Sequence, residues 1–416
     1  MYYIIPLEER KMLITFKYKN FKSFKNENIL DMEATALKEH EYNVVKMKNV
    51  NLLTMAAIYG ANASGKSNVL QAFEYMKKMI LINDDSMGYY QIKEENIYSF
   101  MMNNEPISLE VEILSKDGKI YKYGFESLND KIKSEWMYEK KISKFYTIFE
   151  RKDNIVLMKS NNKNNRYDNL DDKTLFLSIY SKIDKKNSDF NNVYQWFINT
   201  DYLDLENIKI ENFIDNTISA KILSDSNYKI ELQNFISALD LGVEKIKTIP
   251  TSMNDLLKSN GVVKVELLHK VENDKTKSLP LELESNGTRK IIYLFDYLIE
   301  ALKKGKTIFI DDLNTKLHPL LTRYIINLFH NKEINISNAQ LIYTTHDVTN
   351  LNKETFRRDE IWFTEKDNSG VSEIYSLSDY KIDNVKIRND ATFNKDYLTG
   401  RYGAIPELKQ FKMNEI

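Results

Sequence analysis

The segment GANASGKS, residues 60–67, constrains the fold of this chain more than any other part of the sequence. It satisfies the pattern G-x-x-x-x-G-K-[ST], with Gly60, Gly65, Lys66 and Ser67 at the required positions. The apolar run LLTMAAIY precedes it directly, and SNVLQAFEYMKKMIL follows with apolar residues at helical spacing. A strand, a glycine-containing loop and a helix in this order form an anion cradle, because backbone N–H groups and the helix N-terminus point at the ligand. The segment therefore predicts a phosphate-binding loop.

The side chains of this loop have predicted roles in binding a nucleoside triphosphate. Lys66 would neutralise the β- and γ-phosphates, and the Ser67 hydroxyl would bind Mg²⁺. We disfavour the alternative, an ordinary turn between a strand and a helix, because both flanking segments fit the phosphate loop. The remaining residues that we expect to contact the nucleotide are Gly60, Asn62, Ser64, Gly65 and Asn68.

Length and composition limit the class of protein. At 416 residues the chain predicts two or three domains or lobes, and 59 Lys plus Arg nearly balance 60 Asp plus Glu. Bulk charge therefore does not indicate nucleic acid, although a local basic patch remains open. No stretch approaches 18 consecutive apolar residues and the start lacks a signal-peptide pattern, so we expect no membrane span. The absence of cysteine excludes disulfides, thiol catalysis and cysteine zinc sites, and fits a cytoplasmic location.

The order of local patterns predicts an α/β sheet built from both ends of the chain. Strand-like segments fill the first third, the middle is polar with short helical patterns, and KSNNKNNRYDNLDDK is the most loop-like tract. From about residue 281, NGTRKIIYLFDYLIEALKKG and LHPLLTRYIINLFHN predict helices that alternate with the strands TIFI and AQLIYTT. We expect residues 12–150 and 281–416 to form the two parts of the head. Residues 151–280 would be an inserted, mostly helical lobe with some strands, unless their polar start is only a long surface loop.

Two adjacent carboxylates, Asp311 and Asp312, end the apolar run TIFI. Alone, the pair also fits an acidic turn in water, since Asp is a common turn residue. Beside a phosphate loop it predicts a strand whose Asp311 holds magnesium, while Asp312 polarises the attacking water as general base. The strand LIYTTHD ends at His346, in the crevice where open α/β sheets bind ligands, so this side chain is predicted to hydrogen-bond the γ-phosphate.

The segment ESNGTRK opens a predicted helix about 25 residues before the acidic pair. Ser285 at the N-cap and Gly287 in the first turn would expose N–H groups to a phosphate. An ordinary capped helix start explains this stretch equally well.

The order of these motifs resembles that of ABC-type heads, as in SMC and RecF-like ATPases. More closely, the chain resembles the AAA15-type ATPases of the RloA and overcoming-lysogenisation-defect (OLD) group, which are associated with bacterial anti-phage defence. The resemblance covers nearly the whole chain. It rests on ITFKYKNFKSF, IYGANASGKSNVL, ESNGT, DDLNTKLHP, AQLIYTTHD and the tail RRDEIWFTEKD…GVSEIYSLSDYK…YLTGRYGAIP.

The resemblance implies roles for individual residues. Residues 60–67 look like the Walker A loop, Asp311 like the Walker B aspartate and His346 like the switch histidine, with Asn314 and His318 in the D-loop region. The resemblance also implies ATP and Mg²⁺ as cofactors and an ABC-type head without a long coiled coil.

A second set of implied residues concerns a partner subunit. Ser285, Gly287 and Thr288 resemble the signature motif, which contacts ATP bound to a second chain, so two chains would close around two nucleotides as a homodimer. The segment NFKSF, residues 20–24, resembles a stretch near the nucleotide, which makes Lys22 a candidate phosphate contact. No Q-loop glutamine is identifiable.

The chain departs from the family pattern at two positions. Asp312 stands where such heads usually carry Glu, and its shorter side chain predicts slow hydrolysis, because a general base needs hydrogen-bond reach. Asn286 stands where transporter-type signatures carry Gly, but the RloA-like relatives tolerate a polar residue there.

The resemblance implies an ATPase subunit of an anti-phage or abortive-infection system that senses infection or controls a separately encoded effector, commonly a TOPRIM-type or other nuclease. This sequence has no nuclease signature, and we expect Asp359 and Glu360 to be surface charges. The alternative is a RecF- or SMC-like nucleic-acid-binding ATPase of DNA repair, which the near-zero net charge and the lack of a coiled-coil heptad run disfavour. A transporter subunit is a third, weaker reading.

Overall fold

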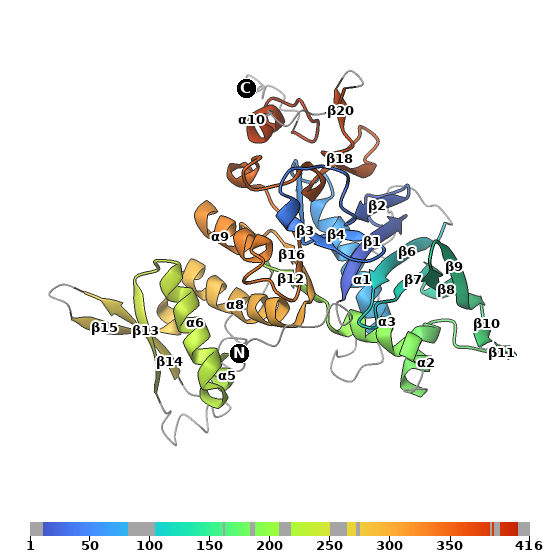
Figure 1. Ribbon diagram of the computed structural model, residues 1–416, viewed down its shortest axis with the longest axis horizontal. Coiled ribbons are helices and arrows are strands. Elements are labelled where there is room, and N and C mark those ends of the chain that lie inside the picture. Colours follow the sequence, from blue (N-terminus) through green and yellow to red (C-terminus); the bar gives the residue numbers. More distant parts are fainter. Residues whose placement is uncertain are drawn as a thin grey trace, which may run out of the picture. The chain divides into compact units, whose positions relative to one another are not determined.

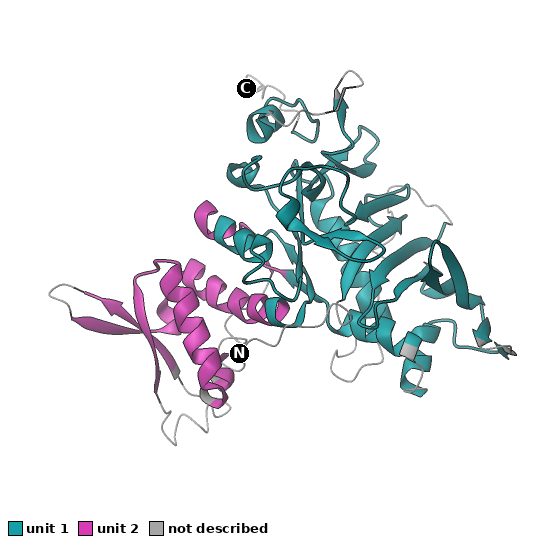
Figure 2. Ribbon diagram, in the orientation of Figure 1, with its two compact units in different colours: residues 1–203, 302–313, 323–416 teal, residues 204–301, 314–322 magenta. Residues whose placement is uncertain are grey.

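The chain divides into two compact units that alternate along the sequence (Figure 2). Residues 1–203, 302–313 and 323–416 form the first unit, and residues 204–301 and 314–322 form the second. The predicted boundaries at 151 and 280 do not coincide with this division, because residues 151–203 belong to the first unit and residues 281–301 to the second. The computed structural model describes residues 11–81, 105–160, 163–183, 188–207, 218–249, 264–271, 275–382, 385–386 and 392–406.

The phosphate loop belongs to a six-stranded sheet assembled from distant parts of the chain (Figure 1). The strand β5 lies between β17 and β18 and runs parallel to both, and β16 runs parallel to β17. Every residue of β5, β16 and β17 is buried, as expected for apolar strands covered on both faces. The predicted sheet from both ends of the chain is confirmed. Its strand order is β12 (Asp201–Asp204), β16 (Thr307–Asp311), β17 (Gln340–Thr344), β5 (Met55–Gly60), β18 (Ile361–Lys366) and β19 (Ser372–Ser376).

Three helices agree with the sequence pattern. The helix α1 spans Lys66–Leu81, α8 spans Asn286–Lys304 and α9 spans Pro319–His330. The helices predicted after residues 66, 285 and 317 are therefore confirmed. The division between the units passes through α8 and α9. Among the described residues the longest helix is α8, with 19 residues, so this part of the chain contains no long coiled coil.

The first unit also contains an eight-stranded antiparallel sheet and the helices α2 (Phe176–Ile183) and α3 (Ser188–Ile198). The tract predicted as a loop contains β11, because Arg166 and its neighbours pair with β10 in a regular antiparallel register. The loop prediction was wrong here because pairing with β10, rather than an apolar pattern, defines this edge strand. The strands are β11 (Lys163–Tyr167), β10 (Ile155–Ser160), β9 (Lys144–Lys152), β8 (Lys131–Lys141), β7 (Ile120–Leu128), β6 (Ile107–Leu114), β1 (Met12–Lys19) and β2 (Asn28–Asp31).

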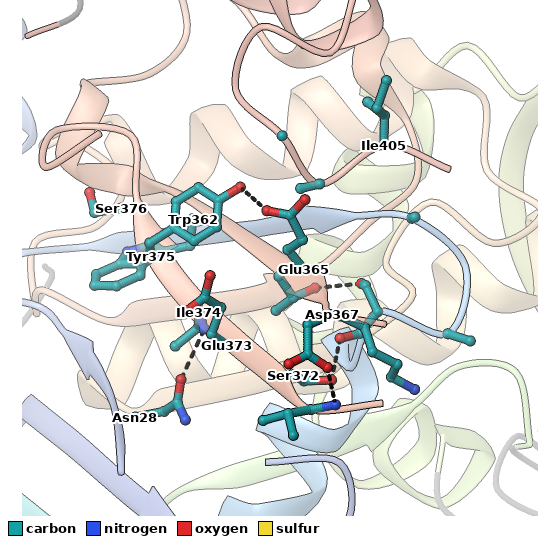
Figure 3. Close-up of a pocket in the computed structure, with 18 of the residues that line it drawn as sticks. Asn28, Trp362, Glu365, Asp367, Ser372, Glu373, Ile374, Tyr375, Ser376 and Ile405 are labelled. Atoms are coloured by element: carbon teal, nitrogen blue, oxygen red, sulfur yellow. Dashed lines mark hydrogen bonds between the residues drawn. The ribbon is translucent and has the colours of Figure 1, made fainter. Parts of the chain in front are cut away.

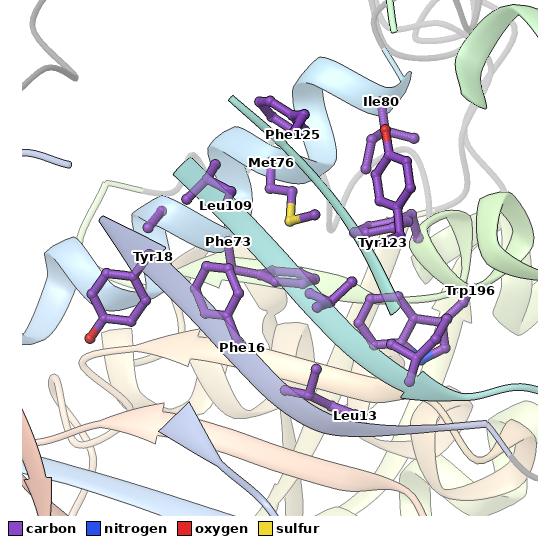
Figure 4. Close-up of a cluster of buried hydrophobic side chains, with 14 of the residues drawn as sticks. Leu13, Phe16, Tyr18, Phe73, Met76, Ile80, Leu109, Tyr123, Phe125 and Trp196 are labelled. Carbon is purple, nitrogen blue, oxygen red and sulfur yellow. The ribbon is translucent and has the colours of Figure 1, made fainter. Parts of the chain in front are cut away.

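One aromatic core joins the two sheets of the first unit and holds α1 between them (Figure 4). The Phe73 side chain of α1 is fully buried and stacks on Phe309 of β16, with ring centroids 4.0 Å apart. On the other side, Phe73 meets Phe16 of β1 and Trp196 of α3 edge to face, at centroid distances of 5.6 and 5.9 Å. Burial of such large side chains fixes α1, and with it the loop at its N-terminus, against β16.

The second unit combines helices with a small antiparallel sheet. The helices α5 (Ser219–Ser224) and α6 (Ser226–Ala238) accompany the strands β13 (Val243–Ile249), β14 (Lys264–Lys270) and β15 (Thr276–Pro280). Asp225 begins α6, and its carboxylate accepts hydrogen bonds from the N–H groups of Asn227 and Tyr228. Leu232, Leu267 and Phe295 belong to one buried cluster that includes residues of α6, β14 and α8.

Asp359 and Glu360 are buried, so their prediction as surface charges was wrong. They are 3% and 0% exposed. The guanidinium of Arg357, also fully buried, donates two hydrogen bonds to Asp359, at 2.9 and 2.7 Å. Glu360 accepts hydrogen bonds from Asn43, more than 300 residues earlier in the chain. Charged groups are buried where such partners exist, and Asn43, unlike Arg357, is distant in the sequence from the carboxylate that it binds.

In the described part of the chain, no helix combines the length and the apolar character needed to cross a membrane.

Candidate nucleotide-binding site

The phosphate loop begins where β5 ends and leads directly into α1. Its two glycines exclude side chains for steric reasons. A Cβ on Gly60, whose φ is 154°, would lie 2.5 Å from the carbonyl oxygen of Thr364. A Cβ on Gly65, whose φ is 114°, would lie 2.9 Å from Oγ of Ser372. Both positions combine positive φ with close neighbours, which is the physical reason for glycine in this pattern.

Lys66 folds back onto the loop that carries it. Its side-chain amine donates hydrogen bonds to the carbonyl oxygens of Gly60 and Ala61, at 3.0 and 2.9 Å. Burial lowers the pKa of Lys66 to about 8, and the carboxylates of Asp312 and Asp311 partly oppose this shift. Lys66 begins α1 directly after the loop, and both carboxylates of β16 act on its charge. The amine is thus positioned to exchange carbonyl partners for phosphate oxygens.

The two carboxylates of the acidic pair have different surroundings. Asp311 ends β16, is 4% exposed, and accepts a hydrogen bond from the Thr344 hydroxyl at 2.5 Å. Asp312 has a left-handed backbone with φ of 52°, a conformation that Asp tolerates better than most residues. Its N–H donates to the same hydroxyl at 2.8 Å. The neighbouring strand β17 therefore holds the carboxylate of Asp311 and the backbone of Asp312.

His346 follows β17 by two residues and faces the acidic pair. Its Nε2 atom lies 3.7 Å from Oδ1 of Asp312. The histidine side chain is 41% exposed, whereas that of Asp312 is 19% exposed. Because β5, β17 and β16 are adjacent and parallel, their carboxyl ends bring the loop, the histidine and the carboxylates to one edge.

The residues present fit a magnesium ion by their chemistry. Asp311 and Ser67 offer the hard oxygen donors that Mg²⁺ takes in nucleotide sites, where water and phosphate supply the remaining ligands. Oδ1 of Asp312 is buried and has no hydrogen-bond donor among the described residues. A buried carboxylate oxygen of this kind needs a donor such as an ordered water.

The segment NFKSF forms a tight turn against the start of α1. Asn20 and Lys22 have positive φ values of 55° and 48°. The Lys22 amine donates to Oε1 of Gln71 at 2.6 Å, and Asn68 donates to Oγ of Ser23 at 2.8 Å. The turn therefore contacts the helix that follows the phosphate loop, and Lys22 stays a candidate phosphate contact.

Sequence reasoning missed a hydroxyl cluster behind the loop. Oγ of Ser372, in β19, lies 2.7 Å from the carbonyl oxygen of Ser64 and 2.8 Å from Oγ of Ser23. Oγ of Ser64 lies 2.6 Å from the Thr364 hydroxyl. These contacts tie the phosphate loop to β18 and β19. No local pattern marks Ser372, because its partners are distant in the sequence.

The three predicted signature residues belong to the second unit. Oγ of Ser285 accepts a hydrogen bond from the N–H of Thr288 at 3.1 Å, so the predicted N-cap is confirmed. A Cβ on Gly287 would lie 3.2 Å from the carbonyl oxygen of Lys316, which places this glycine against the D-loop region. Ser285 itself is exposed, whereas Thr288 is buried.

Lys290 fastens this helix start from within the second unit. It is 2% exposed, and its amine donates to the carbonyl oxygens of Leu205 and Thr315, at 2.8 and 3.0 Å. Lys290 therefore connects the start of α8 with Leu205 and Thr315 inside the second unit.

A hollow of about 1410 Å³ lies beside the phosphate loop, where β18 and β19 continue the sheet away from β17 (Figure 3). Its lining includes residues 61–64 and 403–406. The segment GRYGAIP has a structural explanation here, because a Cβ on Gly403, with φ of 68°, would lie 2.8 Å from Oε2 of Glu365. The Tyr375 hydroxyl donates to the carbonyl oxygen of Tyr402 at 2.7 Å, which attaches this segment to β19.

Comparison with family models identifies the chain. Residues 55–352 match the family described as "AAA domain, putative AbiEii toxin, Type IV TA system". The chain belongs to this family. The match starts with β5 and ends shortly after His346, so it spans the phosphate loop, the second unit, the acidic pair and the histidine.

The solved structures that match this chain include SMC heads and a recombination mediator protein. An SMC head bound to the C-winged helix domain of ScpA is 14% identical, covers 88% of this chain and 97% of its own, and gives a TM-score of 0.49. The SMC head domain from Thermotoga maritima is 14% identical, with 89% and 99% coverage and a TM-score of 0.44. The recombination mediator RecF is 13% identical, with 88% and 98% coverage and a TM-score of 0.38. Among curated proteins, none matches this chain.

The fold is an α/β sheet that carries a phosphate-loop motif between β5 and α1. A phosphate loop follows β5, a carboxylate pair ends β16 and a histidine follows β17, in the order predicted from the sequence. In the sequence, the two segments of the second unit, residues 204–301 and 314–322, follow β12 and β16.

Proposed function

We propose that this member of the family binds ATP with Mg²⁺ and hydrolyses it slowly to ADP and phosphate. The observation that carries the proposal is the meeting of Lys66, the two carboxylates Asp311 and Asp312, and His346 at the carboxyl ends of β5, β16 and β17. Phosphoryl transfer to water needs this combination of a phosphate cradle, a magnesium carboxylate and a water-orienting group.

Each side chain has one part in the reaction. Lys66 leaves the carbonyl oxygens of its own loop and neutralises the β- and γ-phosphates. The Ser67 hydroxyl and Asp311 would hold Mg²⁺, which neutralises charge on the phosphate oxygens. Asp312 orients the attacking water and accepts its proton, and His346 donates a hydrogen bond to the γ-phosphate. The backbone N–H groups of the loop bind the phosphates directly.

The slow rate follows from the length and setting of Asp312. Its carboxylate is one methylene shorter than Glu, and the left-handed backbone at φ of 52° directs it toward His346. A general base has to reach the water within hydrogen-bond distance, so a short side chain lowers the fraction of productive geometries. Such an enzyme holds ATP for long periods and acts as a switch.

We also propose that the site is completed by a second copy of the chain. Ser285 is exposed on the surface of the second unit, at the start of α8, where N–H groups carry a partial positive charge. A γ-phosphate bound to one subunit would meet Ser285, Gly287 and Thr288 of the other. ATP would therefore close a homodimer around two nucleotides.

The cellular role that we propose is an ATPase subunit of an anti-phage or abortive-infection system in the cytoplasm. The family description, which names a toxin of a toxin–antitoxin system, supports a role in such a system. The motifs shared with the RloA and overcoming-lysogenisation-defect group support the same role. ATP-dependent closure would report infection or control a separately encoded effector, such as a TOPRIM-type nuclease.

The experiment that tests the proposal is ATP turnover by the purified chain over a wide range of protein concentrations, with Lys66→Ala as the blank. Turnover above the blank, with specific activity that rises with concentration, is expected for a composite site. Specific activity that is independent of concentration would contradict a dimer that dissociates in this range, but it would still support ATP hydrolysis. Absence of both turnover and ATP binding would refute the proposed activity.

A further inference from the structure

Thr344 of β17 forms hydrogen bonds with residues at the carboxyl end of β16. Thr344 is fully buried at the last position of β17. The two strands are parallel with Ile310 opposite Tyr343, so Asp311 and Thr344 come next on the two strands. The Thr344 hydroxyl reaches both members of the acidic pair, at 2.5 Å to Oδ1 of Asp311 and 2.8 Å to the N–H of Asp312.

The direction of these hydrogen bonds follows from their chemistry. A backbone N–H can only donate, so Asp312 uses a lone pair of the hydroxyl. The single hydroxyl proton then goes to the ionised Asp311, which can only accept. A hydrogen bond to a charged carboxylate is stronger than one between neutral groups. Oδ1 of Asp311 is therefore fixed in orientation.

The backbone of Thr344 holds the same turn. Its carbonyl oxygen accepts a hydrogen bond from the N–H of Leu313 at 3.1 Å. Thr344 therefore binds the N–H of Asp312 and the N–H of the next residue, Leu313. These two hydrogen bonds stabilise the left-handed conformation of Asp312. That conformation in turn sets the position of the Asp312 carboxylate relative to His346.

We propose that Thr344 is a positioning residue that orients the magnesium carboxylate and the catalytic carboxylate together through one hydroxyl group. The proposal rests on the proposed ATPase function. In this proposal β17 does more than lead to His346. Its last residue, Thr344, also orients Asp311 and Asp312 at the end of β16. Partners that orient metal ligands commonly change metal affinity by about 10- to 100-fold when they are removed.

The test compares Thr344→Val with Thr344→Ser. Valine keeps the shape of threonine but removes the hydroxyl, whereas serine keeps the hydroxyl and removes a methyl group. We expect Thr344→Val to raise the Mg²⁺ concentration for half-maximal ATP binding by about tenfold, with unchanged binding of ATP in EDTA. Thr344→Ser should keep the Mg²⁺ dependence of the wild-type chain, because it keeps the hydroxyl. Binding is measured by titration calorimetry, and turnover at saturating Mg²⁺ separates the effect on kcat from that on KM.

A matched variant controls for loss of a buried threonine hydroxyl. Thr307→Val removes the hydroxyl of another fully buried threonine, at the opposite end of β16, where it donates to Gln340 at 3.0 Å. This variant should lower the thermal midpoint without changing the Mg²⁺ dependence. An unchanged Mg²⁺ dependence in Thr344→Val would overturn the proposal. A Thr344→Ser variant with the same altered Mg²⁺ dependence as Thr344→Val would also overturn it.

The outcome for the wild-type chain separates the two proposals. A wild-type chain that binds ATP but has no turnover would refute the hydrolysis, while the binding titrations still test Thr344. A wild-type chain that binds no ATP under either condition would overturn the proposed function and the role of Thr344 together. If Thr344→Val does not fold, the Mg²⁺ dependence of Thr344→Ala and Thr344→Ser decides in the same way.

Discussion

Nε2 of His346 lies 3.7 Å from Oδ1 of Asp312, across the ends of two parallel strands. The same Oδ1 atom is buried and lacks a hydrogen-bond donor among the described residues. A water between the two side chains and the γ-phosphate would satisfy it. This relationship makes the acidic pair of β16 unequal, with one member anchored and the other directed at the histidine.

The first prediction concerns the general base. Asp312→Asn should keep ATP binding but lower turnover by roughly 10²- to 10⁴-fold, because the amide cannot accept the proton of the attacking water. Asp312→Glu should raise turnover, because the longer side chain reaches the water. Single-turnover assays with ATP prebound separate chemistry from binding. A wild-type rate in Asp312→Asn would exclude this residue as the base.

A second prediction follows from the lowered pKa of Lys66. Burial lowers it from 10.5 to about 8, and bound phosphates favour the charged amine, so ATP binding takes up a proton above pH 8. ATP affinity should therefore have its maximal value below pH 8 and fall by up to about tenfold per pH unit above pH 8. The dissociation constant is measured between pH 7.5 and 9.5.

The control for this pH dependence is Lys66→Arg. Arginine stays charged over the whole range, so its ATP affinity, although weaker, should not change between pH 8 and 9.5. The same decline in affinity in both variants would assign the pH dependence to another group.

A third prediction tests the composite site by complementation. Ser285→Asp keeps a good N-cap but places a negative charge against the γ-phosphate of the partner subunit. Ser285→Asp and Lys66→Ala should each be inactive as homodimers. In an equal mixture, half of the dimers are mixed and each has one intact site, so about a quarter of the wild-type activity should return. No recovery despite proven subunit exchange would contradict a signature that acts in trans.

The fourth prediction concerns stability away from the site. The Arg357 side chain is fully buried and binds Asp359, which is 3% exposed, through two hydrogen bonds. Arg357→Met leaves a buried carboxylate without its cation, so we expect the free energy of unfolding of the first unit to fall by about 3–5 kcal/mol. Urea unfolding measures the change.

The matched control is an exposed arginine with a similar partner. Arg166 is 60% exposed and pairs with Asp168, which is 49% exposed. Arg166→Met should change the free energy of unfolding by less than about 1 kcal/mol, because solvent screens such pairs. Equal losses in the two variants would mean that the burial of Arg357 contributes nothing.

The sequence by itself determined the phosphate loop, its flanking strand and helix, and the alternation of strands and helices after residue 281. These features are local, because the loop pattern and the helical and strand periods are complete within a few residues. The order of the motifs also placed Asp311, Asp312 and His346 at strand ends. The predicted roles of these residues await the experiments above.

Only the tertiary structure decided the supports of the site and the boundaries of the units. Ser372 lies against Ser23, 349 positions away, and Thr344 meets the acidic pair only because β17 pairs with β16. Asp359 is buried because Arg357 and Thr35 donate hydrogen bonds to its carboxylate, although the sequence predicted a surface charge. Burial and hydrogen bonding depend on which distant segments meet, and the pattern of one segment contains no information on its partners.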